Sequence, residues 1–79
     1  MFDFALKCVT IAIALNIILP FILTPFASVS EIKPPNGAAM LSFKGQFMHM
    51  MVHHNQVILM SSFIVGLIVF LSVVVAENI

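Results

Sequence analysis

Two long apolar runs dominate the pattern of this sequence. The first carries no charge from Cys8 to Phe26, CVTIAIALNIILPFILTPF, and the second carries none from Val57 to Ala76, VILMSSFIVGLIVFLSVVVA. At about 1.5 Å per helical residue, each run is long enough to cross a hydrocarbon core of about 30 Å. Neither run alternates as a barrel strand does, and lipid offers the backbone no hydrogen bonds, so we expect two helices.

Polar and turn-forming residues separate the runs. The segment ASVSEIKPPNGAA contains two prolines followed by Asn36–Gly37, a pair that readily supplies a turn. We therefore predict an all-α membrane protein, a two-span transmembrane helical hairpin that forms one unit over residues 1–79. The first span is expected at about residues 4–26, the loop at 27–39 and the second helix at 40–76.

Two features affect the interpretation of the first helix: its prolines and its amino-terminal residues. Pro20 removes one backbone hydrogen bond and Pro25 is a natural stop, so the helix should bend or fray near its end. A secretory signal has a similar apolar run, but the start MFDFALK is not the basic segment that such signals carry. We expect this segment to be retained as a span.

A polar stripe precedes the second apolar run. Its members recur at steps of four, three, four and three residues: Ser42, Gln46, His49, His53 and Gln56. At about 100° per residue they share one helix face, which predicts an amphipathic segment continuous with the second span. The resulting helix of about 35 residues would overshoot the hydrocarbon or bend near residues 54–56.

Small and polar residues suggest how the two spans pack. Ser62 and Gly66 have the spacing at which small residues let transmembrane helices approach closely. With antiparallel spans at equal depth, Asn16 should lie level with Gly66. We expect Asn16, Ser62 and Gly66 to be helix-packing residues. No further polar residue is expected at the depth of Asn16, which favours packing over transport.

Composition excludes several classes of protein. The chain has 79 residues, of which 62% are hydrophobic and 8% charged, far from the usage of water-soluble domains. It holds one cysteine, Cys8, and has neither Arg nor a basic patch, so disulfides within the chain and nucleic-acid binding are not expected.

The few charges give a weak indication of topology. Lys33 and Lys44 flank the loop, whereas Lys7 precedes the first span and Glu77 follows the second. The positive-inside rule then predicts a multi-pass protein with its loop on the cytoplasmic-type side and both termini across the membrane.

Two histidines of the stripe are candidate ligands of a cofactor. His49 and His53 emerge one helical turn apart, which suits copper or zinc, and a haem or chlorophyll needs one imidazole per ring. Gly45 would leave room for a flat macrocycle. Two imidazoles are only half a tetrahedral site, however, and Gln46 and Gln56 are poor ligands. Contact of these four side chains with lipid or a partner subunit is the preferred interpretation, and proton handling is a third.

Catalysis and pore formation find little support. The carboxylates Asp3, Glu31 and Glu77 are scattered, and no nucleophile–base spacing is present. A small oligomeric pore would need a more continuous polar lining than the scattered serines, Thr10 and Asn16 provide. We expect no enzyme activity.

The function that remains is that of an accessory subunit. A free-standing hairpin usually carries interfacial Trp and Tyr with terminal Arg or Lys, yet this chain has no Trp, Tyr or Arg. The sequence therefore predicts a small structural subunit at the edge of a larger membrane complex of a bioenergetic membrane, of respiratory or photosynthetic type, which it stabilises or shapes. Its expected partners are other integral-membrane subunits and lipid.

Overall fold

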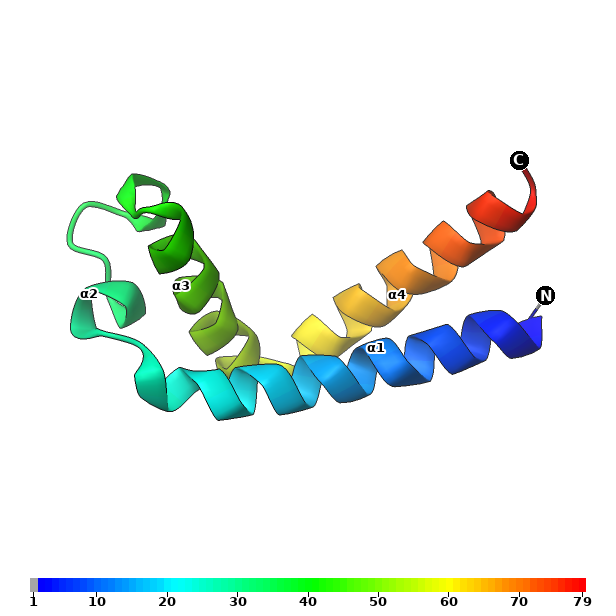
Figure 1. Cartoon of the computed structure of the whole chain (residues 1–79), viewed down its shortest axis with the longest axis horizontal. Helices are drawn as coiled ribbons and strands as arrows, with labels where there is room; N and C mark the ends of the chain where they lie inside the picture. The colour runs from blue at the N-terminus through cyan, green and yellow to red at the C-terminus, as the bar shows by residue number, and fades with distance from the viewer. Residues whose placement is uncertain (1) are drawn as a thin grey trace.

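The computed structural model describes residues 2–79, which are helical with no β-strand. Figure 1 shows one long helix, α1, along which the shorter helices are arranged. The α-helices are α1 (Phe2–Leu23), α2 (Val29–Ile32), α3 (Phe43–Gln56) and α4 (Ile58–Glu77), with 3-10 turns at Thr24–Phe26 and Ala38–Met40.

Helix α1 continues through its internal proline. Pro20 is fully buried, and the helix extends to Leu23 before tightening into the 3-10 turn that contains Pro25. Because the hydroxyl of Thr24 donates to the Pro20 carbonyl at 2.6 Å, the turn after the proline keeps a hydrogen bond. Where bending or fraying was expected, α1 therefore ends in a tightened turn.

The connection between α1 and α3 is ordered by local caps. Ser28 and Glu31 form a capping box at the start of α2, in which each side chain bonds the other's backbone amide. Gly37 has a φ of 90°, which side chains rarely tolerate, and this lets the chain turn toward α3. The predicted loop therefore contains a short helix.

Helices α3 and α4 are separate. Ser42 caps α3 by accepting from the Gly45 amide at 3.1 Å, and Val57, with φ −124° and ψ 53°, leaves the helical conformation between α3 and α4. In Figure 1 the two helices meet at a sharp angle. The prediction of one continuous helix over residues 40–76 is wrong: the helix begins at Phe43, and the chain breaks one residue beyond the segment where a bend was considered.

Helix α4 returns along the first part of α1, so both chain ends lie at one end of the molecule (Figure 1). Gly66 packs against Ile13, and the rings of Phe2 and Phe70 stack with centroids 6.1 Å apart. The last turns of α4 lean away from α1. These contacts join α4 to α1 from Gly66 to Phe70.

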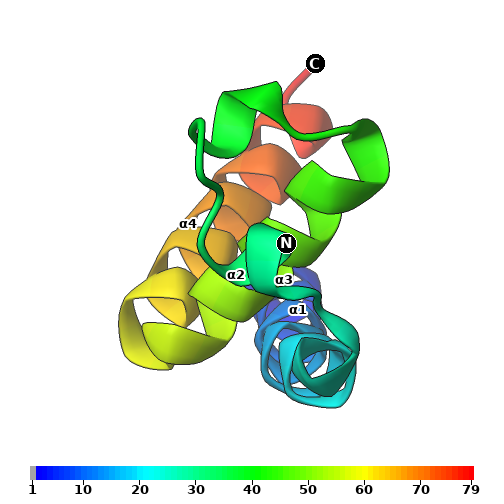
Figure 2. The ribbon, with the colours of Figure 1, turned by 90° about the vertical axis from the view of Figure 1, so that its left-hand side faces the viewer.

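Helix α3 covers the later part of α1. It buries Gly45, Met48 and Val52, while α2 packs beside it. Figure 2 views this end of the molecule, with α2 and α3 in front and the far ends of α1 and α4 behind. All three long helices therefore meet near the break at Val57.

Two helices are long and apolar enough to span a membrane, Phe2–Phe26 and Ile58–Glu77. In each, only 11% of the most apolar stretch is buried inside the structure. Their apolar side chains face outward instead of forming a closed core.

Candidate functional site: a polar cluster at the helix break

Four polar side chains meet where α1, α3 and α4 converge. We call them the Asn16 cluster: Asn16 of α1, His54 of α3, and Ser61 and Ser62 of α4. Asn16 Nδ2 lies 3.0 Å from Ser61 Oγ and 3.1 Å from Ser62 Oγ, and Asn16 Oδ1 lies 2.7 Å from His54 Nδ1. Asn16 and Ser61 are 8% and 5% exposed. The cluster is a hydrogen-bonded junction of three helices.

The break at Val57 creates part of this cluster. In a continuous helix the His54 carbonyl would accept from the amide of Ile58. Here the Ser61 hydroxyl donates to that carbonyl at 3.0 Å, and the Ser61 amide bonds the Val57 carbonyl at 2.8 Å. Ser61 therefore satisfies a carbonyl at the break and at the same time receives the Asn16 amide.

The hydrogen bonds of the cluster have one consistent direction. The Ser61 hydroxyl faces two carbonyls, those of His54 at 3.0 Å and Ile58 at 3.3 Å, and a carbonyl can only accept. Ser61 Oγ must therefore accept from Asn16, so the amide nitrogen faces the serines and Oδ1 faces His54. The imidazole then donates through Nδ1–H.

An apolar recess of about 250 Å³ adjoins the cluster, and we call it the His54 recess. Asn16 and His54 form its polar wall. The rest of the wall comes from α1, α3 and α4: Ala12, Leu15, Leu19, Pro20, Met51 and Val65. A recess of this kind suits a small apolar group that makes one polar contact.

The structure places the three predicted packing residues between α1 and α4 but shifts their register. Asn16 contacts Ser61 and Ser62, whereas Gly66 lies against Ile13 and Val9. The prediction that Asn16 lies level with Gly66 is wrong by about one helical turn. Equal depth of the two uncharged runs was assumed, but α4 lies along the earlier part of α1 while α3 covers its later part.

His54 was not among the predicted site residues, and no further polar residue was expected at the depth of Asn16. That expectation is wrong, because α3 brings an imidazole to within 2.7 Å of the amide. The sequence did contain one signal for such a partner. If the side-chain amide of Asn16 is buried, it requires hydrogen-bond acceptors and donors nearby. The adjacent serines and the histidine nearest the second apolar run were the candidates to supply them.

The polar stripe of α3 mostly organises the chain's own loop. Gln46 donates to the carbonyl of Leu41 at 3.0 Å, and His49 Nδ1 lies 2.7 Å from the carbonyl of Glu31 in α2. His53 and Gln56 are exposed. The stripe thus divides into loop-holding residues and a short exposed end.

His49 and His53 remain together, with parallel rings whose centroids are 6.3 Å apart. Because the Glu31 carbonyl only accepts, His49 donates through Nδ1–H and keeps its Nε2 lone pair when neutral. Gly45, however, is buried, and a Cβ there would lie 3.0 Å from Leu41 Cβ. The room expected for a macrocycle at Gly45 is filled by Leu41.

Metal-ligating side chains do not gather elsewhere in residues 2–79: no group of three or more His, Cys, Asp or Glu side chains is close enough to hold an ion. Cys8 is free and half-buried.

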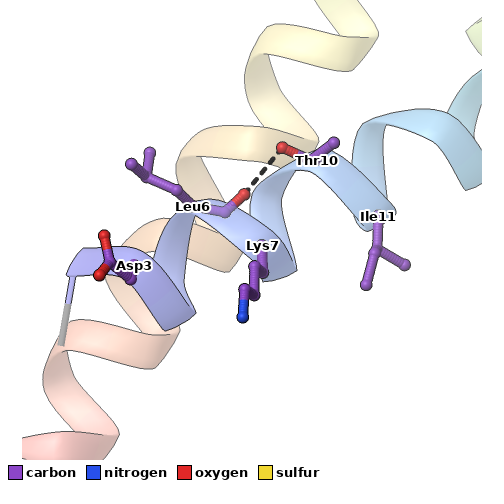
Figure 3. A pocket seen from close by; sticks show the side chains of 5 residues that line it. All are labelled: Asp3, Leu6, Lys7, Thr10 and Ile11. Carbon is purple, nitrogen blue, oxygen red and sulfur yellow. Dashed lines mark hydrogen bonds between the residues drawn. The ribbon is translucent and has the colours of Figure 1, made fainter.

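A second recess, of about 490 Å³, lies along the start of α1 (Figure 3). It is lined by Asp3, Leu6, Lys7, Thr10 and Ile11. The Thr10 hydroxyl donates to the Leu6 carbonyl of its own helix at 2.8 Å. In Figure 3 the Lys7 side chain points away from this hydrogen bond. Because all five residues come from one helix, this recess is a surface furrow.

Comparison with protein-family models, with curated proteins and with solved structures gives no match for this chain.

Proposed function

We propose that this chain is a small integral-membrane accessory subunit that packs at the edge of a larger membrane complex and stabilises or shapes it. One observation carries the proposal: the outer faces of α1 and α4 are almost wholly apolar and exposed, with 11% of each apolar stretch buried. Contiguous apolar surface on this scale indicates contact with lipid or another protein. The role is structural and involves no catalysis.

A bilayer explains why the buried polar atoms of the Asn16 cluster are bonded to one another. If α1 spans the membrane from Phe2, Asn16 lies about 21 Å along it at about 1.5 Å per residue, well inside the hydrocarbon. Polar groups at that depth need partners within the protein. Among residues 2–79, every buried side-chain nitrogen and oxygen has one.

Neighbouring subunits would supply what the chain lacks as an independent hairpin. It has no Trp, Tyr or Arg to set its depth. The exposed end of the α3 stripe, His53 with Gln56, offers polar contacts beside the apolar surface of α1 and α4. We propose that other integral-membrane subunits cover part of this apolar surface and part of the exposed end of the α3 stripe.

Native gel electrophoresis of membranes extracted in a mild detergent tests the proposal. We expect the tagged full-length chain to migrate with a large assembly and to resist alkaline extraction. A combined His53→Ala and Gln56→Ala variant should weaken co-migration, while Thr10→Val, which removes only a bond within one helix, should not. Migration of the wild-type chain as a free small species would reject the subunit role, and release by alkali would reject membrane integration.

The topology is a separate part of the proposal. We propose that the loop lies on the cytoplasmic-type side, supported only by Lys33 and Lys44 beside it. In a Cys8→Ala background, Asn36→Cys and Asn78→Cys should react with a membrane-impermeant maleimide from opposite sides. Labelling of both cysteines from the same side of the membrane would contradict this topology.

A second candidate function is ligation of copper, haem or chlorophyll by His49 and His53. The observation in its favour is the His49 Nδ1–H bond to the Glu31 carbonyl, since metal-binding imidazoles are commonly oriented in this way through their other nitrogen. The absorption spectrum and metal content of the purified chain test it. A chromophore or copper that is lost in His49→Ala and kept in His54→Ala would establish this function.

A further inference from the structure

The hydrogen bonds of the Asn16 cluster leave one ring nitrogen of His54 without a partner within residues 2–79. Asn16 is oriented by two serines, and its Oδ1 receives Nδ1–H of His54 at 2.7 Å. In the neutral imidazole the other nitrogen, Nε2, then carries the lone pair. No hydrogen bond within residues 2–79 reaches Nε2, so this nitrogen is available as an acceptor.

His54 lines the His54 recess, and the character of this recess restricts what the imidazole can meet. The His54 recess has a volume of about 250 Å³, and its polar wall consists of Asn16 and His54. The Asn16 amide is already engaged through both of its polar atoms. A ligand must therefore be apolar over most of its surface and offer a single donor to the imidazole.

We propose that the His54 recess binds a lipid-soluble phenol or hydroquinone whose ring hydroxyl donates to Nε2 of His54. A phenolic hydroxyl is a good donor, with an ordinary pKa of about 10. Its six-membered ring matches a recess of this size, whereas a tetrapyrrole is several times larger. Met51, on the recess wall, offers a thioether, a group that makes favourable contacts with aromatic rings.

The position of the recess agrees with this class of ligand. Leu15 lines it and is 49% exposed, so the recess opens onto the apolar outer surface of α1. A molecule dissolved in the hydrocarbon would reach it without crossing a polar barrier. The proposal needs no partner subunit, so its failure and that of the subunit role can be told apart.

Binding is tested with 4-pentylphenol, using 4-pentylanisole as the matched probe that lacks the donor. The full-length chain, labelled with ¹⁵N at histidine, is placed in lipid nanodiscs at mildly alkaline pH. Before ligand is added, His54 should show a protonated Nδ1 and an unprotonated Nε2. The phenol should shift the Nε2 resonance saturably, and the anisole should bind about three- to tenfold more weakly, as expected for loss of one hydrogen bond.

Two leucine variants test the location without touching the cluster. Leu15→Trp fills the recess from its rim and should abolish the phenol-induced shift. Leu67→Trp changes a leucine of similar exposure, 48% against 49%, that does not line the recess, and should leave the shift intact. Equal binding of phenol and anisole, equal behaviour of the two variants, or a protonated Nε2 in the free protein would each overturn the proposal.

Discussion

The imidazole of His54 and the side-chain amide of Asn16, 38 residues apart in the chain, are joined by a hydrogen bond of 2.7 Å. This contact connects α3 to α1 beside the point where α3 and α4 separate. Because Asn16 also donates to two serines of α4, a single amide ties together the three long helices.

Removal of the amide should destabilise the packed state. Asn16→Ala deletes three hydrogen bonds, and at about 0.6 kcal/mol for each intramembrane bond we expect a loss of about 2 kcal/mol. The measurement is unfolding in mixed micelles with increasing SDS, followed by energy transfer between fluorophores at the two chain ends. Thr10→Ala, which loses only a bond to the Leu6 carbonyl of its own helix, is the control and should change stability little. A similar effect of both variants would contradict the role of the cluster.

The register of α4 on α1 can be tested by cross-linking. In a Cys8→Ala background, Asn16→Cys paired with Ser61→Cys should form a disulfide on mild oxidation, because these side chains are in contact. Asn16→Cys paired with Gly66→Cys should form far less, since Gly66 faces Ile13 and Val9 instead. Mobility on non-reducing gels reports the yield. The opposite order of yields would return the packing to the equal-depth arrangement.

Gly66 should be sensitive to side-chain size. A Cβ at this position would lie 3.2 Å from Ile13 Cδ1, the flexible end of a side chain, so Gly66→Ala should be tolerated. Gly66→Ile overfills the contact and should cost about 1–3 kcal/mol in the same unfolding assay.

The double variant Gly66→Ile with Ile13→Ala provides the check on this mechanism. Because the two side chains share one space, the second change should recover part of the lost stability, a non-additivity typical of residues in contact. Purely additive losses would show that Gly66 acts through something other than Ile13.

The bond between His49 and the Glu31 carbonyl should hold α2 against α3. His49→Ala removes this 2.7 Å contact, and amide hydrogen exchange at residues 29–33 should accelerate while exchange in α4 stays unchanged. His53→Ala serves as the matched control, because that exposed imidazole makes no hydrogen bond within residues 2–79. Faster exchange in both variants would point to a general effect on α3 instead.

Much of the secondary structure was predictable because it depends on local properties. Run length and apolarity indicated two long helices, and the Pro- and Gly-containing segment indicated the connection between them. The capping of α3 by Ser42 follows from a side-chain oxygen three residues before a free amide, also a local effect. A bend near residues 54–56 was one of the two alternatives, but the break at Val57 could not be placed exactly, because no proline or glycine marks it and its energetic compensation comes from Ser61 and Asn16.

The candidate site was harder to predict. Periodicity grouped His49 and His53 correctly on one face, but it could not show that His49 would bond a loop carbonyl or that Leu41 would fill the space beside Gly45. His54 lies off that stripe, so the periodicity did not indicate it as a site residue. Its partner is distant in the chain, and helical periodicity carries no information about contacts between helices.

Composition and run length alone thus determined that the chain forms long apolar helices. The unfavourable free energies of hydrating an uncharged tract and of leaving backbone groups unpaired in lipid depend on each segment by itself. Tertiary structure decided the register of α4 on α1, the break at Val57 and the assembly of the Asn16 cluster. These depend on which donors and acceptors of distant segments come within about 3 Å of one another, and hydrogen bonds lose strength steeply outside that narrow range of distance and angle.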